Sequence, residues 1–114
     1  MLHARQRFHG HGSLKYLFKN GGMARSHYFT LKYHPNPRRK DSRYAVIVSK
    51  KIHKSAVGRN RIRRRVYELL RNEHPELSGV NDIAVIVTSG EVLAADSQKL
   101  RASLRDLLKQ AQLI

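Results

Sequence analysis

Two runs of β-branched and other apolar residues, separated by an amphipathic segment, constrain the fold of this chain more than any other feature. The runs are YAVIVS at residues 44–49 and DIAVIVT at residues 82–88. Continuous apolar runs of this length predict strands that are covered on both faces. The intervening residues 59–73 place apolar side chains on one helical face, namely Ile62, Val66, Leu69 and Leu70. Strand, helix and strand in this order predict a βαβ crossover in a small α/β sandwich.

Another strand is predicted before this unit, over residues 28–33, where side chains alternate between two faces. The set expected to face the core is Phe29, Leu31 and Tyr33. The set expected on the more open face is Tyr28, Thr30 and Lys32. A Pro-rich loop leads from this strand to residues 44–49, and we expect the two strands to pair, with residues 44–49 as the central strand.

Two further helices are predicted near the ends of the chain. Ser13 is placed to cap a short helix that runs through Lys19 and stops at Gly21. Asp96 opens a final helix, whose apolar face is Leu100, Leu104, Leu107, Leu108 and Ala111. The expected order of elements is therefore αββαβα, and the expected class is α+β.

Length and charge narrow the function. The 114 residues suit one domain, residues 1–114. Lys and Arg number 23 against 8 Asp and Glu, and the net charge of +15 predicts a polyanionic partner. The excess lies in residues 1–71, which hold 19 basic and 2 acidic residues. A membrane surface fits less well, because an interfacial helix needs large apolar residues opposite its cations and the chain has no Trp.

The rest of the composition excludes other classes of site. Without Cys the chain has neither disulfides nor thiolate metal ligands, and its scattered His and acidic residues predict no metal site and no catalytic constellation. Residues 1–12 are basic but lack the apolar segment of a signal peptide. We expect these residues to form a flexible basic arm, and we expect a cytoplasmic protein.

The segment over residues 49–71 carries the binding chemistry. Nine of its 23 residues are Lys or Arg, and only Glu68 is acidic. Like charges at i, i+3 and i+4 repel, and the macrodipole disfavours cations near a helix N-terminus. A local conflict of this kind indicates an anionic ligand. Arginine suits phosphate because its planar guanidinium presents forked donors.

At these residues the chain resembles the protein subunit of bacterial ribonuclease P. The signature of that family is an Arg-Asn-Arg core followed by basic residues, which stands here as Gly58-Arg59-Asn60-Arg61-Ile62-Arg63-Arg64. The resemblance extends upstream through Val48-Ser49-Lys50-Lys51 and downstream through a hydrophobic strand and a Leu-rich helix. It implies a protein that assists a catalytic RNA in removing the 5′ leader of precursor tRNA, with Mg²⁺ serving the RNA-catalysed reaction. It also implies a left-handed crossover around the basic helix.

The resemblance implies two sets of binding residues. The set that would dock on the RNA subunit is Lys50, Lys51, Lys54, Arg59, Asn60, Arg61, Arg63, Arg64 and Arg65. The set that would hold the single-stranded leader, by stacking and nearby cations, is Lys15, Phe18, Lys19, Tyr28, Thr30 and Lys32. Phe18 is equally compatible with a core position. The turn Arg38-Arg39-Lys40 is expected to be solvated, with a secondary role in RNA contact.

Charge alone leaves a second class of function open. A non-catalytic module that binds structured RNA, such as a small ribosomal protein, would carry a similar excess of cations. Residues 48–64 favour the ribonuclease P subunit, because strand end, loop, signature and helix follow one another in the family's order. On this interpretation the chain is part of an endoribonuclease whose catalytic groups lie on RNA. Its partners are the catalytic RNA and precursor tRNA, with no protein partner and no membrane.

Overall fold

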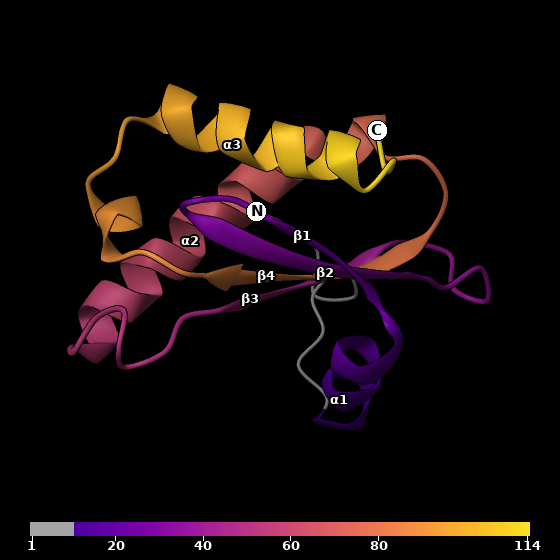
Figure 1. Cartoon of the computed structure of the whole chain (residues 1–114), viewed down its shortest axis with the longest axis horizontal. Coiled ribbons are helices and arrows are strands. Elements are labelled where there is room, and N and C mark those ends of the chain that lie inside the picture. Colours follow the sequence, from indigo (N-terminus) through magenta and orange to yellow (C-terminus); the bar gives the residue numbers. More distant parts are fainter. Residues whose placement is uncertain (1–10) are drawn as a thin grey trace.

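Residues 11–114 are described by a computed structural model, in which helices lie on both faces of one sheet (Figure 1). The sheet contains β1 (Gly22–Arg25), β2 (Phe29–Pro35), β3 (Arg43–Ile47) and β4 (Asn81–Val87). The helices are α1 (His11–Asn20), α2 (Ala56–Glu73) and α3 (Ser97–Gln110), with short 3₁₀ turns η2 (His74–Glu76) and η3 (Gly90–Leu93). The α+β class is the predicted one.

The strands pair with different neighbours from the predicted ones. The sheet order is β1-β2-β4-β3, so β4 lies between an antiparallel β2 and a parallel β3. Residues 44–49 therefore contribute an edge strand, and the predicted pairing with residues 28–33 is wrong. The amide of Val46 in this edge strand donates to the Tyr67 hydroxyl of α2 at 3.3 Å, which covers part of the open edge. The predicted order of elements also lacked β1, and the observed order of helices and strands is αβββαβα.

The larger core lies between the sheet and the helices α2 and α3, on the upper side in Figure 1. The predicted stripe of α2 and the predicted leucines of α3 face it, and each of these side chains is at most 8 % exposed. Tyr44 lies in this core with its hydroxyl 2.5 Å from Nδ1 of His74. Burial, and to a lesser degree the charge of Asp41, raises the pKa of the Tyr44 phenol far above its ordinary value.

Helix α1 begins earlier than its sequence suggested, but it stops before Gly21 as predicted. It begins at His11, so Ser13 lies inside the helix and is not its cap. It ends at Asn20, as expected, because the Gly21 amide donates to the Leu17 carbonyl at 2.8 Å. A Cβ on Gly21 would lie 2.6 Å from that oxygen, so the turn requires glycine. The expected arm, residues 1–12, lies outside the described residues apart from its last two, which belong to α1.

Helix α2 begins three residues earlier than predicted, at Ala56 and not at Arg59. The hydroxyl of Ser55 accepts a hydrogen bond from the Gly58 amide at 2.9 Å and so caps the helix. The arginine run consequently starts in the second turn. Since the macrodipole acts mainly within the first turn, most of the expected conflict between dipole and cations is absent.

Candidate nucleic-acid interface

Helix α1 divides the second face of the sheet into two flanks. The strand register aligns the side chains of this face in rows across β2, β4 and β3. The middle row is Lys32, Ala84 and Ala45, and Leu17 of α1 packs on the two alanines. The row on one side is Thr30, Ile86 and Ile47. The row on the other side is His34, Asp82 and Arg43. One flank of α1 is therefore mostly apolar and the other is charged.

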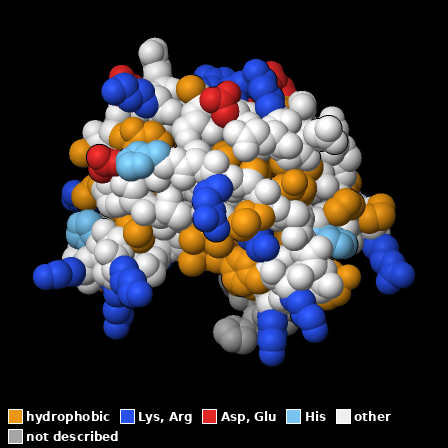
Figure 2. Space-filling model, viewed as in Figure 1, with side chains coloured by type: hydrophobic (Ala, Val, Ile, Leu, Met, Phe, Trp, Pro, Cys, Tyr) orange, Lys and Arg blue, Asp and Glu red, His pale blue; other side chains and the backbone are white. Residues whose placement is uncertain are grey.

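The surface is hollowed between the α1 lobe and the N-terminal end of α2, as Figure 2 shows, with basic side chains on both lobes and hydrophobic ones between them. Leu14 of α1 packs with Ile47 of the apolar row. Phe18, one turn later, lies on the same side of α1 and is 40 % exposed. Phe18 is therefore not a core residue, and its ring is open to a ligand in the hollow.

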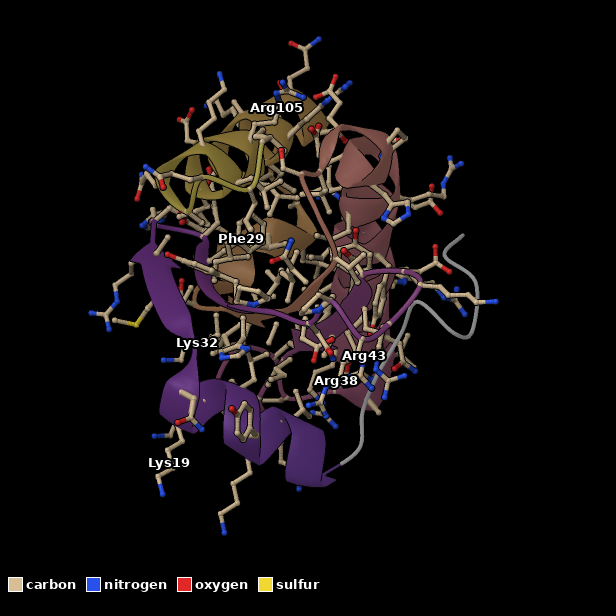
Figure 3. All side chains as sticks on the ribbon, turned by 90° about the vertical axis from the view of Figure 1, so that its right-hand side faces the viewer. Lys19, Phe29, Lys32, Arg38, Arg43 and Arg105 are labelled. Carbon is tan, nitrogen blue, oxygen red and sulfur yellow. The ribbon has the colours of Figure 1, made fainter. Side chains whose placement is uncertain are left out.

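The structure brings some of the predicted leader residues together and separates others. Lys15, Phe18 and Lys19 are exposed on α1, and Lys32 is half-buried in the middle row. Lys19 and Lys32 extend on the same side of the molecule in Figure 3. Thr30 belongs to the apolar row but is only 8 % exposed, against the expectation of an open position.

Tyr28 does not join this group. It precedes β2 and packs partly against the larger core, on the side of the sheet away from α1. It lines a pocket of about 310 Å³ with residues of η3 and the start of α3, among them Glu91, Asp96 and Lys99. Alternation along a strand predicted a shared face with Lys32, but Tyr28 lies in the turn before the strand and does not follow that alternation.

The loop between β3 and α2 is fixed against the helix. The guanidinium of Arg59 donates to the carbonyl oxygens of His53 at 3.0 Å and Lys54 at 2.9 Å. The amide of Ser55 donates to Nδ1 of His53 at 3.2 Å, and the imidazole lies against Gly58. Arg59 thus holds the lysine-bearing loop in place, which leaves less of its guanidinium for phosphate than the sequence indicated.

Exposed cations follow one another along α2 and the loop before it, and we call this set the cationic face: Lys50, Lys51, Lys54, Arg61 and Arg64. All five side chains are exposed, and within residues 14–114 none has an ion pair or hydrogen bond. Asn60 is exposed beside them and accepts a hydrogen bond from the half-buried Arg63. Free cations grouped on one surface are the footprint of a phosphate-binding face.

Arg65 has a different role from its neighbours. One terminal nitrogen of its guanidinium donates to the carbonyl oxygens of Val92 at 2.7 Å and Leu93 at 3.1 Å. The other donates to the Ala95 carbonyl at 2.7 Å and to the Ser97 hydroxyl at 3.0 Å. Both terminal nitrogens are therefore used to fasten the connection between η3 and α3 to α2, and the side chain is not presented with the cationic face.

Five of the eight acidic side chains form ion pairs with basic residues among the described residues. The ion pairs are Glu68 with Arg71, Glu73 with Arg101 and Arg105, Glu76 with Arg105, Asp82 with Arg43, and Glu91 with His27. A hydrogen bond with His27 lowers the pKa of the Glu91 carboxyl most, and a hydrogen bond from Ser89 lowers it further. Across the part of the chain that the structure describes, no three His, Asp or Glu residues are grouped to hold a metal ion. None of the described helices is long and apolar enough to cross a membrane.

Comparison with known proteins places this architecture in a family. The ribonuclease P protein component of Synechococcus elongatus is 36 % identical over 74 residues, which cover 65 % of this chain and 61 % of that relative. The chain thus aligns with less than two thirds of that relative's length. The component of Synechococcus sp. (strain JA-2-3B'a(2-13)) is 29 % identical over 117 residues, covering 100 % of this chain and 87 % of the relative.

Solved structures of ribonuclease P proteins resemble this chain in fold. The ribonuclease P protein of Thermotoga maritima matches with a TM-score of 0.82 at 28 % identity, covering 93 % of this chain and 97 % of that one. The Staphylococcus aureus protein matches with a TM-score of 0.82 at 24 % identity over 95 % of this chain and 96 % of that one, which supports the fold alone. The family model for ribonuclease P matches residues 2–112. The chain therefore belongs to the ribonuclease P protein family.

Proposed function

We propose that this chain is the protein component of a ribonuclease P, which binds a catalytic RNA and precursor tRNA and supports removal of the 5′ leader. The observation that carries the proposal is the cationic face of α2, whose five exposed cations have no partner in the described residues. An unpaired cluster of this kind gains affinity by releasing counterions from RNA. Family membership supplies the identity of the RNA that this face would meet.

The leader would lie in the hollow between α1 and the N-terminal end of α2. The supporting observations are the exposed ring of Phe18 and the exposed cations Lys15 and Lys19 of the same helix. A single strand is held without sequence preference when bases stack on aromatic rings and cations follow the backbone. Lys32 extends toward the same side, whereas Tyr28 and the covered Thr30 are left out of this proposed site.

Catalysis would take place on the RNA, and Mg²⁺ would be bound there. This part of the proposal is supported by the ion pairs of Asp82 and Glu73, whose carboxylates are held by arginines of the same chain. Phosphodiester hydrolysis by protein groups needs carboxylate or imidazole groups that converge on the scissile phosphate. The protein would lower the Mg²⁺ requirement by screening repulsion between two RNAs.

Salt-dependent binding to the RNA subunit tests the proposal. The variant Lys51→Ala, Arg61→Ala, Arg64→Ala should bind more weakly, and its plot of log affinity against log salt should flatten by about one unit per lost phosphate contact. Arg59 is kept, because its removal would also release the loop. The control of equal charge is Arg71→Ala, Lys99→Ala, Lys109→Ala, which should bind nearly as the parent does. Equal affinity of both variants would contradict the proposed face.

Cleavage assays test where the chemistry occurs. The protein alone should leave precursor tRNA intact, and the RNA subunit alone should cleave slowly at high Mg²⁺. Adding the protein should restore cleavage at low Mg²⁺, and the variant Asp82→Asn should retain this effect. Cleavage at the correct phosphate by RNA-free protein, abolished by a carboxylate substitution, would show that this assignment of the catalytic groups is wrong.

A further inference from the structure

A pocket of about 580 Å³ lies on the charged flank of α1, opposite the hollow described above. Its lining combines Tyr16 of α1, the charged row of the sheet, and the loop between β2 and β3. Arg38 of that loop and Arg43 of β3 lie beside one another next to α1 in Figure 3. Because Leu17 packs on the sheet between the two flanks, this pocket is separate from the proposed leader site.

The aromatic wall of the pocket is Tyr16. Tyr16 is 58 % exposed, which makes it one of the most exposed large hydrophobic residues described. Its only ring contact among the described residues is with His34, edge to face, with centroids 5.4 Å apart. An exposed tyrosine beside a cationic wall is the arrangement on which an unpaired base stacks.

The cationic wall is held in place by its own loop. The Arg39 amide donates to the Asn36 carbonyl at 3.2 Å, which closes a turn with Pro37 in its second position. The Asn36 amide donates in turn to the Val80 carbonyl at 2.8 Å. The turn therefore presents Arg38 and Arg39 on a fixed backbone, and within residues 14–114 neither side chain has an ion pair or hydrogen bond.

The one acid in the lining does not cancel this charge. Asp82 accepts two hydrogen bonds from Arg43, each 2.9 Å long, and one from the Asn36 side chain at 3.0 Å. Its charge is thereby matched by Arg43, and the charges of Arg38 and Arg39 remain in excess. The pocket offers forked phosphate donors on one side and a ring face on the other.

We propose that this pocket binds one nucleotide of single-stranded RNA, with the base on Tyr16 and the adjoining phosphate on Arg38 and Arg39. A duplex is a poorer fit, since its bases are stacked within the helix and cannot reach a ring. We identify this single-stranded RNA as the leader of precursor tRNA, so this identification rests on the proposed function. The nucleotide would be one farther from the cleavage site, where the leader has passed beyond α1.

Precursor tRNAs whose leaders are shortened one nucleotide at a time test this site in the complex of protein and RNA subunit. The parent should gain affinity once the leader is long enough to reach the pocket. Tyr16→Ala, and separately Arg38→Ala with Arg39→Ala, should remove that gain, a loss of about fivefold or more, and leave short leaders unaffected. Tyr16→Phe keeps the ring and should bind as the parent does. Lys40→Ala, in the same loop but outside the pocket lining, is the charge control.

Three outcomes would overturn this proposal. The pocket takes no leader nucleotide if both pocket variants bind every leader as the parent does. The leader is the wrong ligand if the variants instead lose affinity for the RNA subunit alone. If Lys40→Ala loses as much affinity for long leaders as Arg38→Ala with Arg39→Ala does, the effect comes from the charge of the loop in general and not from the pocket. Failure of the proposed function is seen separately, because a parent chain would then bind neither the RNA subunit nor precursor tRNA.

Discussion

The imidazole of His53 occupies the space where a side chain on Gly58 would lie. A Cβ on Gly58 would come within 2.1 Å of Cε1 of that ring, and Gly58 itself is buried in the first turn of α2. The same imidazole accepts a hydrogen bond from the Ser55 amide, so the loop and the helix cap share one contact. The glycine that opens the basic signature is therefore favoured by its packing against His53.

Gly58→Ala should destabilise the free protein by about 1 kcal/mol. Overpacking costs about 1 to 3 kcal/mol, and the better helix propensity of Ala returns about 1 kcal/mol. In a His53→Ala background the steric conflict is gone, and the same substitution should raise the free energy of unfolding. Urea titration of the four proteins measures both effects. A loss of equal size in both backgrounds would show that His53 is not what excludes the side chain.

Neighbouring arginines should separate stability from RNA affinity. Arg65→Ala removes hydrogen bonds to the connection between η3 and α3, and it should lower the free energy of unfolding by about 2 kcal/mol. Arg64→Ala changes an exposed, unpaired side chain, so its stability should stay within about 0.5 kcal/mol of the parent. Its affinity for the RNA subunit should fall instead. Denaturant titration and RNA binding of the two variants check this division, which a stability loss in Arg64→Ala would contradict.

Phe18→Ala should weaken binding of precursor tRNA and spare mature tRNA. A stacked base is worth about 1 to 3 kcal/mol, and only the precursor carries the leader that would reach this ring. Tyr28→Ala is the matched aromatic control, because Tyr28 lies beside η3 and not in the hollow. Affinities are compared for both tRNAs in the presence of the RNA subunit. A larger precursor-specific loss in Tyr28→Ala than in Phe18→Ala would reverse the proposed assignment.

Tyr44 should contribute to loss of stability in alkali. Its phenol has a raised pKa in the folded state, so above about pH 10 the unfolded chain releases a proton that the folded chain keeps. The free energy of unfolding should then fall by up to about 1.4 kcal/mol per pH unit from this group. Tyr44→Phe should reduce that slope by one proton, with Tyr16→Phe, at an exposed ring, as the control. Denaturant titrations between pH 9 and about 11 measure how the free energy of unfolding of each protein depends on pH. An unchanged slope in Tyr44→Phe would contradict the role of Tyr44.

The sequence predicted which segments form elements better than it predicted their neighbours. The stripe of Ile62, Val66 and Leu69 and the leucine face of α3 are intrinsic to one helix, and both are buried as expected. Strand pairing is a property of two distant segments, and an apolar run such as residues 44–49 does not say which strand lies beside it. β1 escaped notice because it is four residues long and only Ala24 in it is buried.

The sequence contained a signal for the structural role of one arginine. Arg65 follows Ile62 by three residues and precedes Leu69 by four, so it borders the buried stripe of α2. That position distinguishes Arg65 from Arg61 and Arg64. It could have indicated a structural role for Arg65 within the arginine-rich segment. The pocket at Tyr16 had no such signal. It depends on the register that sets His34 opposite Asp82 and Asp82 opposite Arg43, which no local pattern specifies.

The position of β4 in the sheet affects how this chain folds as it leaves the ribosome. Both β2 and β3 bond to β4, which is the last strand to be synthesised. Until residues 81–87 emerge, a nascent chain holds two strands whose facing edges are unsatisfied, and contacts of such long sequence separation form slowly. During that interval α2 has no completed sheet on which to pack. The cationic face is therefore assembled late in synthesis, which limits how early a nascent chain can engage RNA in its native geometry.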